Sequence, residues 1–228
     1  MEKNVFIVIA AYNEAHSVPE VIKELQKANH RNIVVVDDGS RDNTFKAALN
    51  AGATVLRHIV NRGQGAALKT GIDYALREGA DIIVTFDADG QHRVEDIPAI
   101  IKPVAQGKVD VTFGSRFLKK DSGVPFLRKV LLKIGILVVW LFYGVKMTDA
   151  HNGFRALSRN AAEKIRITSD RMAHASEIVE EVHRLKLKYR EVPVTIRYTE
   201  ATLKKGHGSF AEGCRILYNM IMKKFLLR

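Results

Sequence analysis

Cysteine is nearly absent from this chain of 228 residues, in which Cys214 is the single thiol. One thiol excludes an intramolecular disulfide framework and a zinc site built from several thiolates, and it is typical of a reducing compartment. Long hydrophobic runs are also absent. The longest uncharged stretch covers residues 134–145, which is well short of the roughly 20 apolar residues of a membrane-spanning helix. The apolar run at the N-terminus is short and has no cleavage site after it, so we expect neither a signal peptide nor a spanning helix.

Sequence motifs of several large enzyme classes are missing as well. The chain has no Walker A sequence, no His-Glu-x-x-His and no Gly-x-Ser-x-Gly, which disfavours phosphate-loop hydrolases, zincin proteases and α/β-hydrolases. Acidic residues are scarce only in the second half: residues 1–115 hold 13 basic and 15 acidic side chains, whereas residues 116–228 hold 23 and 10. The formal net charge of +11 therefore comes from the C-terminal half and favours an anionic partner.

The first half of the sequence alternates short β-branched runs with longer amphipathic segments. This alternation predicts one α/β domain with a Rossmann-like, mainly parallel sheet that is flanked by helices. Ser17 to Glu20 has the spacing of a capping box and predicts the start of the first helix. The expected strands are 5–10, 33–36, 54–57, 82–86 and 109–114, and the expected helices are 18–28, 44–50, 64–78 and 94–105.

Polar clusters follow three of the predicted strands, at residues 12–14, 37–40 and 87–91. An open α/β sheet binds its ligands at the carboxyl ends of its strands, so we expect these clusters to lie together. In the third cluster Asp87, Asp89 and Gln91 place two carboxylates and an amide oxygen at alternate positions. Such donors suit Mg²⁺ or Mn²⁺ that also holds a diphosphate. An isolated Asp-x-Asp is more often a solvated turn, but its place after a buried strand favours the metal site.

The second half of the sequence is apolar and basic. Residues 130–143 carry Trp140 and Tyr143 among aliphatic residues, and the last helix has one apolar face. These segments are predicted to be amphipathic helices, which lie either at a membrane surface or in the core. A loop at 148–155, a helix at 173–184 and a strand at 192–198 are expected between them.

Six motifs in order resemble the family 2 glycosyltransferases, and among them the polyprenol-phosphate mannose and glucose synthases. The likeness runs from about Phe6 to Arg155. It departs from the family at Ala10, where a proline is usual. The motifs that carry it are Ile9–Glu14, Asp37–Asp42, Asn61–Ala66, Asp87–Gln91, Gly114–Arg116 and Thr148–Arg155.

This resemblance implies a GT-A fold and an inverting, metal-dependent transfer of a sugar from a nucleotide diphosphate sugar, either GDP-mannose or UDP-glucose or UDP-GlcNAc. It implies catalytic roles for Asp87, Asp89 and Arg116, and a Mg²⁺ or Mn²⁺ held by Asp87, Asp89 and Gln91. The donor-binding residues that it implies are Ala10, Tyr12, Glu14, Asp37, Asp38, Gly65, Asp87 and Ala88.

The acceptor implied by the resemblance is a polyprenyl phosphate, dolichyl or undecaprenyl. A phosphate is already an anion, so such an enzyme needs cations to position it and no general base. Arg116, Arg128 and Arg155 are the expected phosphate-binding residues. We expect residues 1–228 to form one domain, with a nucleotide-sugar half at 1–115 and an acceptor-binding, membrane-facing half at 116–228. We expect it peripherally on the cytoplasmic face of a membrane, either alone or with a small membrane protein partner.

Other functions remain open at this point. A non-processive transferase that uses a glycan hydroxyl needs a carboxylate base near the sugar, for which Asp149 is the candidate. A donor-binding scaffold without catalysis would not need the two aspartates and the arginines. Nucleic-acid binding would agree with the basic half, but no recognition-helix pattern supports it. We therefore expect no nucleic-acid partner.

Overall fold

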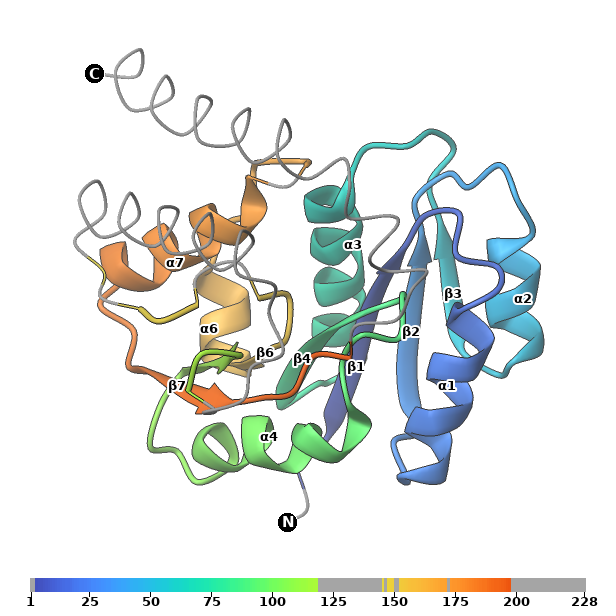
Figure 1. Cartoon of the computed structure of the whole chain (residues 1–228). Coiled ribbons are helices and arrows are strands. Elements are labelled where there is room, and N and C mark those ends of the chain that lie inside the picture. Colours follow the sequence, from blue (N-terminus) through green and yellow to red (C-terminus); the bar gives the residue numbers. More distant parts are fainter. Residues whose placement is uncertain (1–2, 119–144, 146, 150–151, 172, 198–228) are drawn as a thin grey trace.

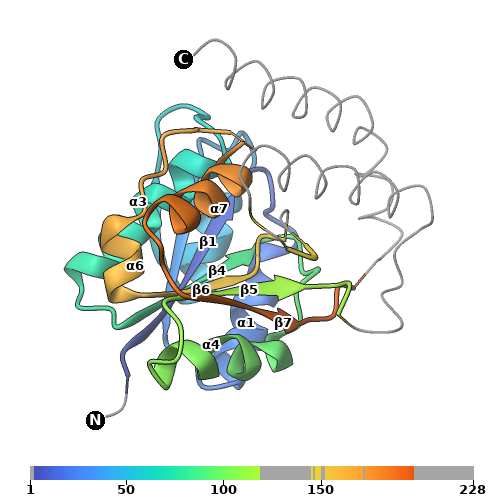
Figure 2. The same cartoon turned by 90° about the vertical axis from the view of Figure 1, so that its left-hand side faces the viewer.

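The computed structural model describes residues 3–118, 145, 147–149, 152–171 and 173–197. In this part of the chain seven strands form one sheet, with helices on both of its faces (Figures 1 and 2). The strands are β1 Val5–Ala11, β2 Asn32–Asp37, β3 Thr54–Arg57, β4 Ile82–Asp87, β5 Val111–Ser115, β6 Arg155–Ser158 and β7 Tyr189–Pro193. The helices are α1 Val18–Lys27, α2 Thr44–Asn50, α3 Gln64–Arg77, α4 Ile97–Ala105, α6 Arg159–Lys164 and α7 His174–Arg184, with a 3-10 turn η1 at Val94–Asp96.

The strand order in the sheet is β3-β2-β1-β4-β6-β5-β7. β6 runs antiparallel to β4 and β5, while the other neighbours are parallel. Ala11 pairs with Asp37 on β2, and Ala10 pairs with Asp87 on β4. This register brings the ends of β1, β2 and β4 to the same edge, which confirms that the three polar clusters converge.

The core lies in two layers, one on each face of the sheet. Ile7 and Ile9 of β1 pack with buried residues of α1 and α4, whereas Phe6 and Val8 pack with α3, α6 and α7. Figure 2 shows these two groups of helices on opposite faces. Alternate residues of a strand point to opposite faces, so the apolar runs of β1, β2 and β4 are buried on both sides.

Sequence analysis did not predict some local features correctly. Ser17 makes no capping bond to the start of α1, so the predicted capping box is wrong, and its hydroxyl donates to Glu14 Oε2 instead. β6 and α6 were not predicted. β7 covers residues 189–193 rather than 192–198, and beyond it only Ile196 forms a bridge, to His92.

Several predictions fall outside the described residues. They concern Cys214, Arg128, the amphipathic segment at 130–143 and the C-terminal helix. Within the described ranges, no helix combines the length and apolar character needed to span a bilayer. The division of the chain into two functional halves stays a prediction.

Candidate active site

The turn after β4 carries the two aspartates predicted to hold a metal. Asp87 ends the strand, and its side chain is 30% exposed. Its Oδ2 lies 2.8 Å from His92 Nε2, and its Oδ1 accepts a hydrogen bond of 3.2 Å from Gln64 Nε2. Asp89 Oδ1 accepts the backbone N–H of Gln91 at 3.0 Å. The turn is therefore braced from α3 and from its own backbone.

The two carboxylates differ in their affinity for protons. Burial raises the pKa of Asp87, but attraction to His92, and then to Arg155 and His174, outweighs burial and lowers that pKa. Burial, and next the negative charge of Asp87, raise the pKa of Asp89. Two carboxylates that repel each other in a partly buried turn are stabilised by a divalent cation.

The residues present fit such a cation, and they would supply part of its coordination shell. Among the described residues, no three His, Cys, Asp or Glu side chains are grouped as a metal site. Asp87 and Asp89 would therefore supply two carboxylates, with Gln91 as the predicted third ligand. Mg²⁺ commonly binds in this way, through one or two carboxylates together with water and substrate phosphates.

His92 is a site residue that sequence analysis missed. It is 3% exposed, and its ring lies edge-on to Phe86, with centroids 5.3 Å apart, and against Phe154 at 5.0 Å. These aromatic contacts aim Nε2 at Asp87. The signal available in the sequence was its position directly after Gln91, but a histidine in a polar turn is ordinarily exposed.

Gly153, two residues before β6, lies where a side chain would not fit. A Cβ built on it would lie 2.7 Å from Asp87 Oδ1. Its carbonyl also accepts a hydrogen bond of 2.5 Å from the hydroxyl of Thr85, one strand away. A side chain at position 153 would therefore collide with the Asp87 carboxylate and displace it.

Arg116 and Asp149 form a buried ion pair on the other side of the site. Arg116 Nε lies 2.6 Å from Asp149 Oδ2, and the backbone N–H of Arg116 donates to the same oxygen at 3.1 Å. Arg116 is 8% exposed and Asp149 is 1% exposed. Glu191 of β7 holds this loop, because Oε1 accepts the backbone N–H groups of Thr148 and Asp149 at 2.9 and 3.0 Å. Asp149 is therefore bound through Oδ2 by the side chain and the backbone of Arg116.

Arg155, the first residue of β6, is completely buried. Its guanidinium lies 5.9 Å from the centre of the Phe113 ring, and none of its three nitrogens has a hydrogen-bond partner among the described residues. Burial lowers the pKa of Arg155 to about 10, against the attraction of Asp87 and Asp149. Arg155 therefore remains a cation at neutral pH, attracted by the carboxylates of Asp87 and Asp149.

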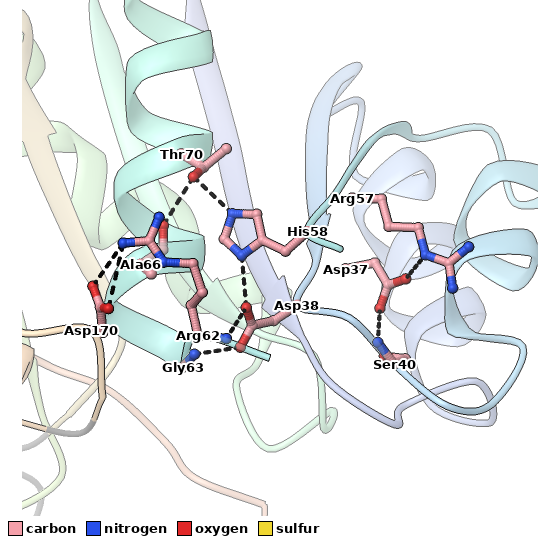
Figure 3. A network of polar contacts seen from close by, with 10 residues as sticks. All are labelled: Asp37, Asp38, Ser40, Arg57, His58, Arg62, Gly63, Ala66, Thr70 and Asp170. Atoms are coloured by element: carbon pink, nitrogen blue, oxygen red, sulfur yellow. Dashed lines mark hydrogen bonds and ion pairs between the residues drawn. The ribbon is translucent and has the colours of Figure 1, made fainter. Parts of the chain in front are cut away.

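The predicted donor residues lie at the ends of β1 and β2. Tyr12 is 40% exposed, whereas Asp37 and Asp38 are buried. Asp37 Oδ1 accepts the backbone N–H of Ser40 at 3.0 Å, and Oδ2 lies 3.2 Å from Arg57 Nε (Figure 3). Glu14 is half-buried, and its backbone N–H donates to Thr44 Oγ1 at 2.8 Å. These contacts fix the loops that would border a bound nucleotide.

Gly65 lies in the first turn of α3 and is one of the residues that the resemblance implies for donor binding. The chain itself packs closely against it, because a Cβ on Gly65 would lie 2.0 Å from the carbonyl oxygen of Ser169. The N–H of Ala66 donates to the carbonyl of Asp170 at 3.1 Å. The segment at 169–170 therefore covers this helix N-terminus. Donor binding by Gly65, like that by Ala10 and Ala88, stays a prediction.

The chain is similar to known proteins in sequence and in fold. The sequence profile described as "Glycosyl transferase family 2" matches residues 6–166. An uncharacterized protein of Methanocaldococcus jannaschii is 40% identical, with coverage of 96% of this chain and 92% of that protein. The UDP-N-acetylglucosamine–dolichyl-phosphate N-acetylglucosaminyltransferase of Methanococcus voltae is 33% identical, covering 98% and 97%. The polyprenol monophosphomannose synthase of Mycolicibacterium smegmatis is 31% identical, covering 86% and 78%.

Among solved structures, the glucosyl-3-phosphoglycerate synthase of Mycobacterium tuberculosis matches with a TM-score of 0.73 and 16% identity, over 97% of this chain and 79% of that chain. This likeness concerns the fold. Together with the sheet order, it confirms the predicted GT-A architecture.

Proposed function

Because the chain belongs to glycosyl transferase family 2, we propose that it transfers a sugar from a nucleotide diphosphate sugar to a polyprenyl phosphate. In this reaction a phosphate oxygen of the lipid attacks the anomeric carbon. The nucleoside diphosphate leaves from the opposite face, so the configuration inverts. Membership of glycosyl transferase family 2, with relatives named as polyprenyl-phosphate sugar transferases, is shown by the sequence matches.

The observation that carries the choice of acceptor is the Arg116–Asp149 pair. A hydroxyl acceptor needs a free carboxylate to remove its proton. Asp149, the candidate for that task, is buried and is bound through Oδ2 by the side chain and the backbone of Arg116. A phosphate acceptor needs a positioned cation instead, and Arg116 supplies one.

Support for the donor and the metal comes from the turn after β4. Asp87 and Asp89 would hold Mg²⁺ or Mn²⁺, with Gln91 as a third ligand. When bound, the cation would neutralise the charge that develops on the leaving diphosphate. The mycobacterial glucosyl-3-phosphoglycerate synthase, which has a similar fold, was crystallised with Mn²⁺ and UDP, and this agrees with the assignment.

Each group of residues has a separate task in this proposal. Tyr12, Glu14 and the loops fixed by Asp37 and Asp38 would border the base and ribose. Arg116 would orient the acceptor phosphate, with Arg128 as a second cation. Arg155, the third arginine expected to bind the phosphate, is completely buried. In this proposal its charge would act on the site through Asp87 and Asp149.

We place the reaction at a membrane surface, because the acceptor is a lipid and the basic excess of the chain lies in residues 116–228. The proposal includes peripheral attachment on the cytoplasmic face, by the chain itself or through a small membrane protein.

The test is transfer of radiolabel from GDP-mannose, UDP-glucose and UDP-GlcNAc into an organic-extractable product. Purified protein would be supplied with undecaprenyl or dolichyl phosphate and Mg²⁺ or Mn²⁺, with Asp89→Asn as the inactive control. We expect lipid-linked label from one of the donors, lost in the variant. Metal-dependent donor hydrolysis without lipid label would contradict the acceptor and keep the donor site.

A further inference from the structure

A chain of hydrogen bonds beside the donor site has no part in the transfer described so far. His58 lies between β2 and α3: its Nδ1 is 2.7 Å from Asp38 Oδ1, and its Nε2 is 2.9 Å from Thr70 Oγ1 (Figure 3). The side chains of His58 and Asp38 are 12% and 3% exposed. The bridge is thus buried between the sheet edge and the helix.

The network assigns the orientation of the His58 ring. A carboxylate only accepts hydrogen bonds, so the proton that faces Asp38 is on Nδ1. A ring turned by 180° would place carbon atoms against both Asp38 and Thr70 and would lose both contacts. His58 therefore has one favoured rotamer, and it fixes the Asp38 carboxylate from one side.

Asp38 in turn holds the loop that leads into α3. Its Oδ1 also accepts the N–H of Arg62 at 3.0 Å, and its Oδ2 accepts the N–H of Gly63 at 2.6 Å. Gly63 has a φ of 110°, and a Cβ there would meet the carbonyl oxygen of Asp170 at 2.4 Å. The chain itself therefore binds both oxygens of Asp38, and the loop is held between Asp38 and Asp170.

The next residue, Gln64 at the start of α3, contacts the turn after β4 that is proposed to bind the metal. Gln64 Nε2 donates to Asp87 Oδ1 at 3.2 Å. A rigid link therefore runs from His58 through Asp38 and the backbone at residues 62–63 to Gln64 and Asp87. Partners of metal ligands commonly set the orientation of the ligand and so its affinity for the ion.

We propose that His58 is a positioning residue of the donor site: by fixing Asp38 it holds the loop at 62–64, and thereby the Gln64 contact that orients Asp87. The proposal rests on the proposed function in one respect, which is that Asp87 binds the cation. It gives Asp38 a role in holding this loop, in place of direct contact with the nucleotide.

Three variants and a control test this proposal. His58→Ala removes both contacts, His58→Asn keeps a donor near the position of Nδ1, and Thr70→Val removes the hydroxyl at nearly constant volume. Ile100→Ala, in a buried position of α4 on the opposite face of the sheet, controls for a general loss of stability. The measurements are hydrogen exchange of the Arg62 and Gly63 amides and Mn²⁺ binding followed by electron paramagnetic resonance.

We expect His58→Ala to speed exchange of both amides and to weaken Mn²⁺ binding, each by about tenfold. His58→Asn should stay within about threefold of wild type, with Thr70→Val between the two. Ile100→Ala should lower the melting temperature and leave Mn²⁺ affinity unchanged. Unchanged exchange and Mn²⁺ affinity in a folded His58→Ala variant would overturn the proposal. Faster exchange in a protein that binds no Mn²⁺ at all would support the link to the loop and refute the metal site.

Discussion

Two regions of one sheet edge differ in how their buried charges are satisfied. At the end of β2, both oxygens of Asp38 accept hydrogen bonds from the chain. At the end of β4 and the start of β6, Arg155 is buried without a hydrogen bond among the described residues, and so is Nδ1 of His92. An unsatisfied buried polar group costs about 1–3 kcal/mol.

We infer that the first region acts as a scaffold and the second as the reaction site. In the first region the chain binds both oxygens of Asp38 and so holds the loops in place. Among the described residues, the second region leaves the Arg155 nitrogens and Nδ1 of His92 without hydrogen bonds, which is expected where substrate, cation or water completes the network. Carboxylates that look alike in the sequence, Asp38 and Asp87, thus take different tasks because of their neighbours.

The largest expected effect is at the metal-binding turn. Asp87→Asn and Asp89→Asn keep shape and remove charge, and we expect each to lower the transfer rate by roughly a thousandfold. Asp73→Asn, an exposed ion-pair position on α3, is the matched control and should behave as wild type. A steady-state assay at saturating Mn²⁺ measures this, and an active Asp89→Asn enzyme would remove the distinction between the two regions.

Arg155 should come next. Its charge helps to lower the pKa of Asp87, so Arg155→Met should raise that pKa and move the acidic limb of the pH–rate profile to higher pH. We expect a rate loss of about a hundredfold. Arg155→Lys should keep the position of the limb because the charge remains. The exposed Arg159→Met substitution is the control. An unshifted limb in Arg155→Met would show that the buried cation does not act on Asp87.

A smaller effect is expected at the Arg116–Asp149 pair. Asp149→Asn weakens the hold on Arg116, and we expect it to raise KM for the lipid phosphate about tenfold with little change in kcat. Glu191→Gln, which keeps one acceptor oxygen for the same loop, should have a weaker effect of the same kind. A large loss of kcat together with loss of the acidic limb of the pH–rate profile would instead indicate that Asp149 is a general base.

The smallest effect concerns stability alone. Burial, and then the charge of Arg155, lower the pKa of His174 to about 4. In the unfolded chain it is about 6.5, so the unfolded state binds more protons between these values. The free energy of unfolding should therefore fall, by about 3 kcal/mol in total, as the pH drops from about 6.5 to about 4. Urea unfolding at several pH values checks this, and an equal pH dependence in His174→Gln would contradict it.

Much of the parallel part of the fold could be predicted because its strands are buried on both faces. Runs such as Val34–Val36 give a strong signal whatever their partners. β6 gives none, since it has four residues and begins with a charged one. Its burial depends on pairing with β4 and β5, which no local pattern encodes.

For the site, sequence motifs predicted which residues lie close together but not which groups of the chain bind each of them. Asp37, the last residue of β2, and Asp38, the residue after it, are of the same type. Only the fold shows that His58 and the amides of Arg62 and Gly63 bind Asp38. Donor binding by Gly65 stays a prediction, and the fold adds that Gly63 and Gly65 lie against the chain at 169–170, a contact between segments about 100 residues apart in the sequence.

The most direct test of the central claim compares two acceptors that differ in one group. Undecaprenyl phosphate and undecaprenol would be supplied at equal concentration, with the donor that the wild-type protein uses. We expect label in the phosphate-bearing lipid only, because Arg116 is positioned to bind an anion and Asp149 is its ion-pair partner. Equal or faster transfer to the alcohol would contradict a phosphate acceptor.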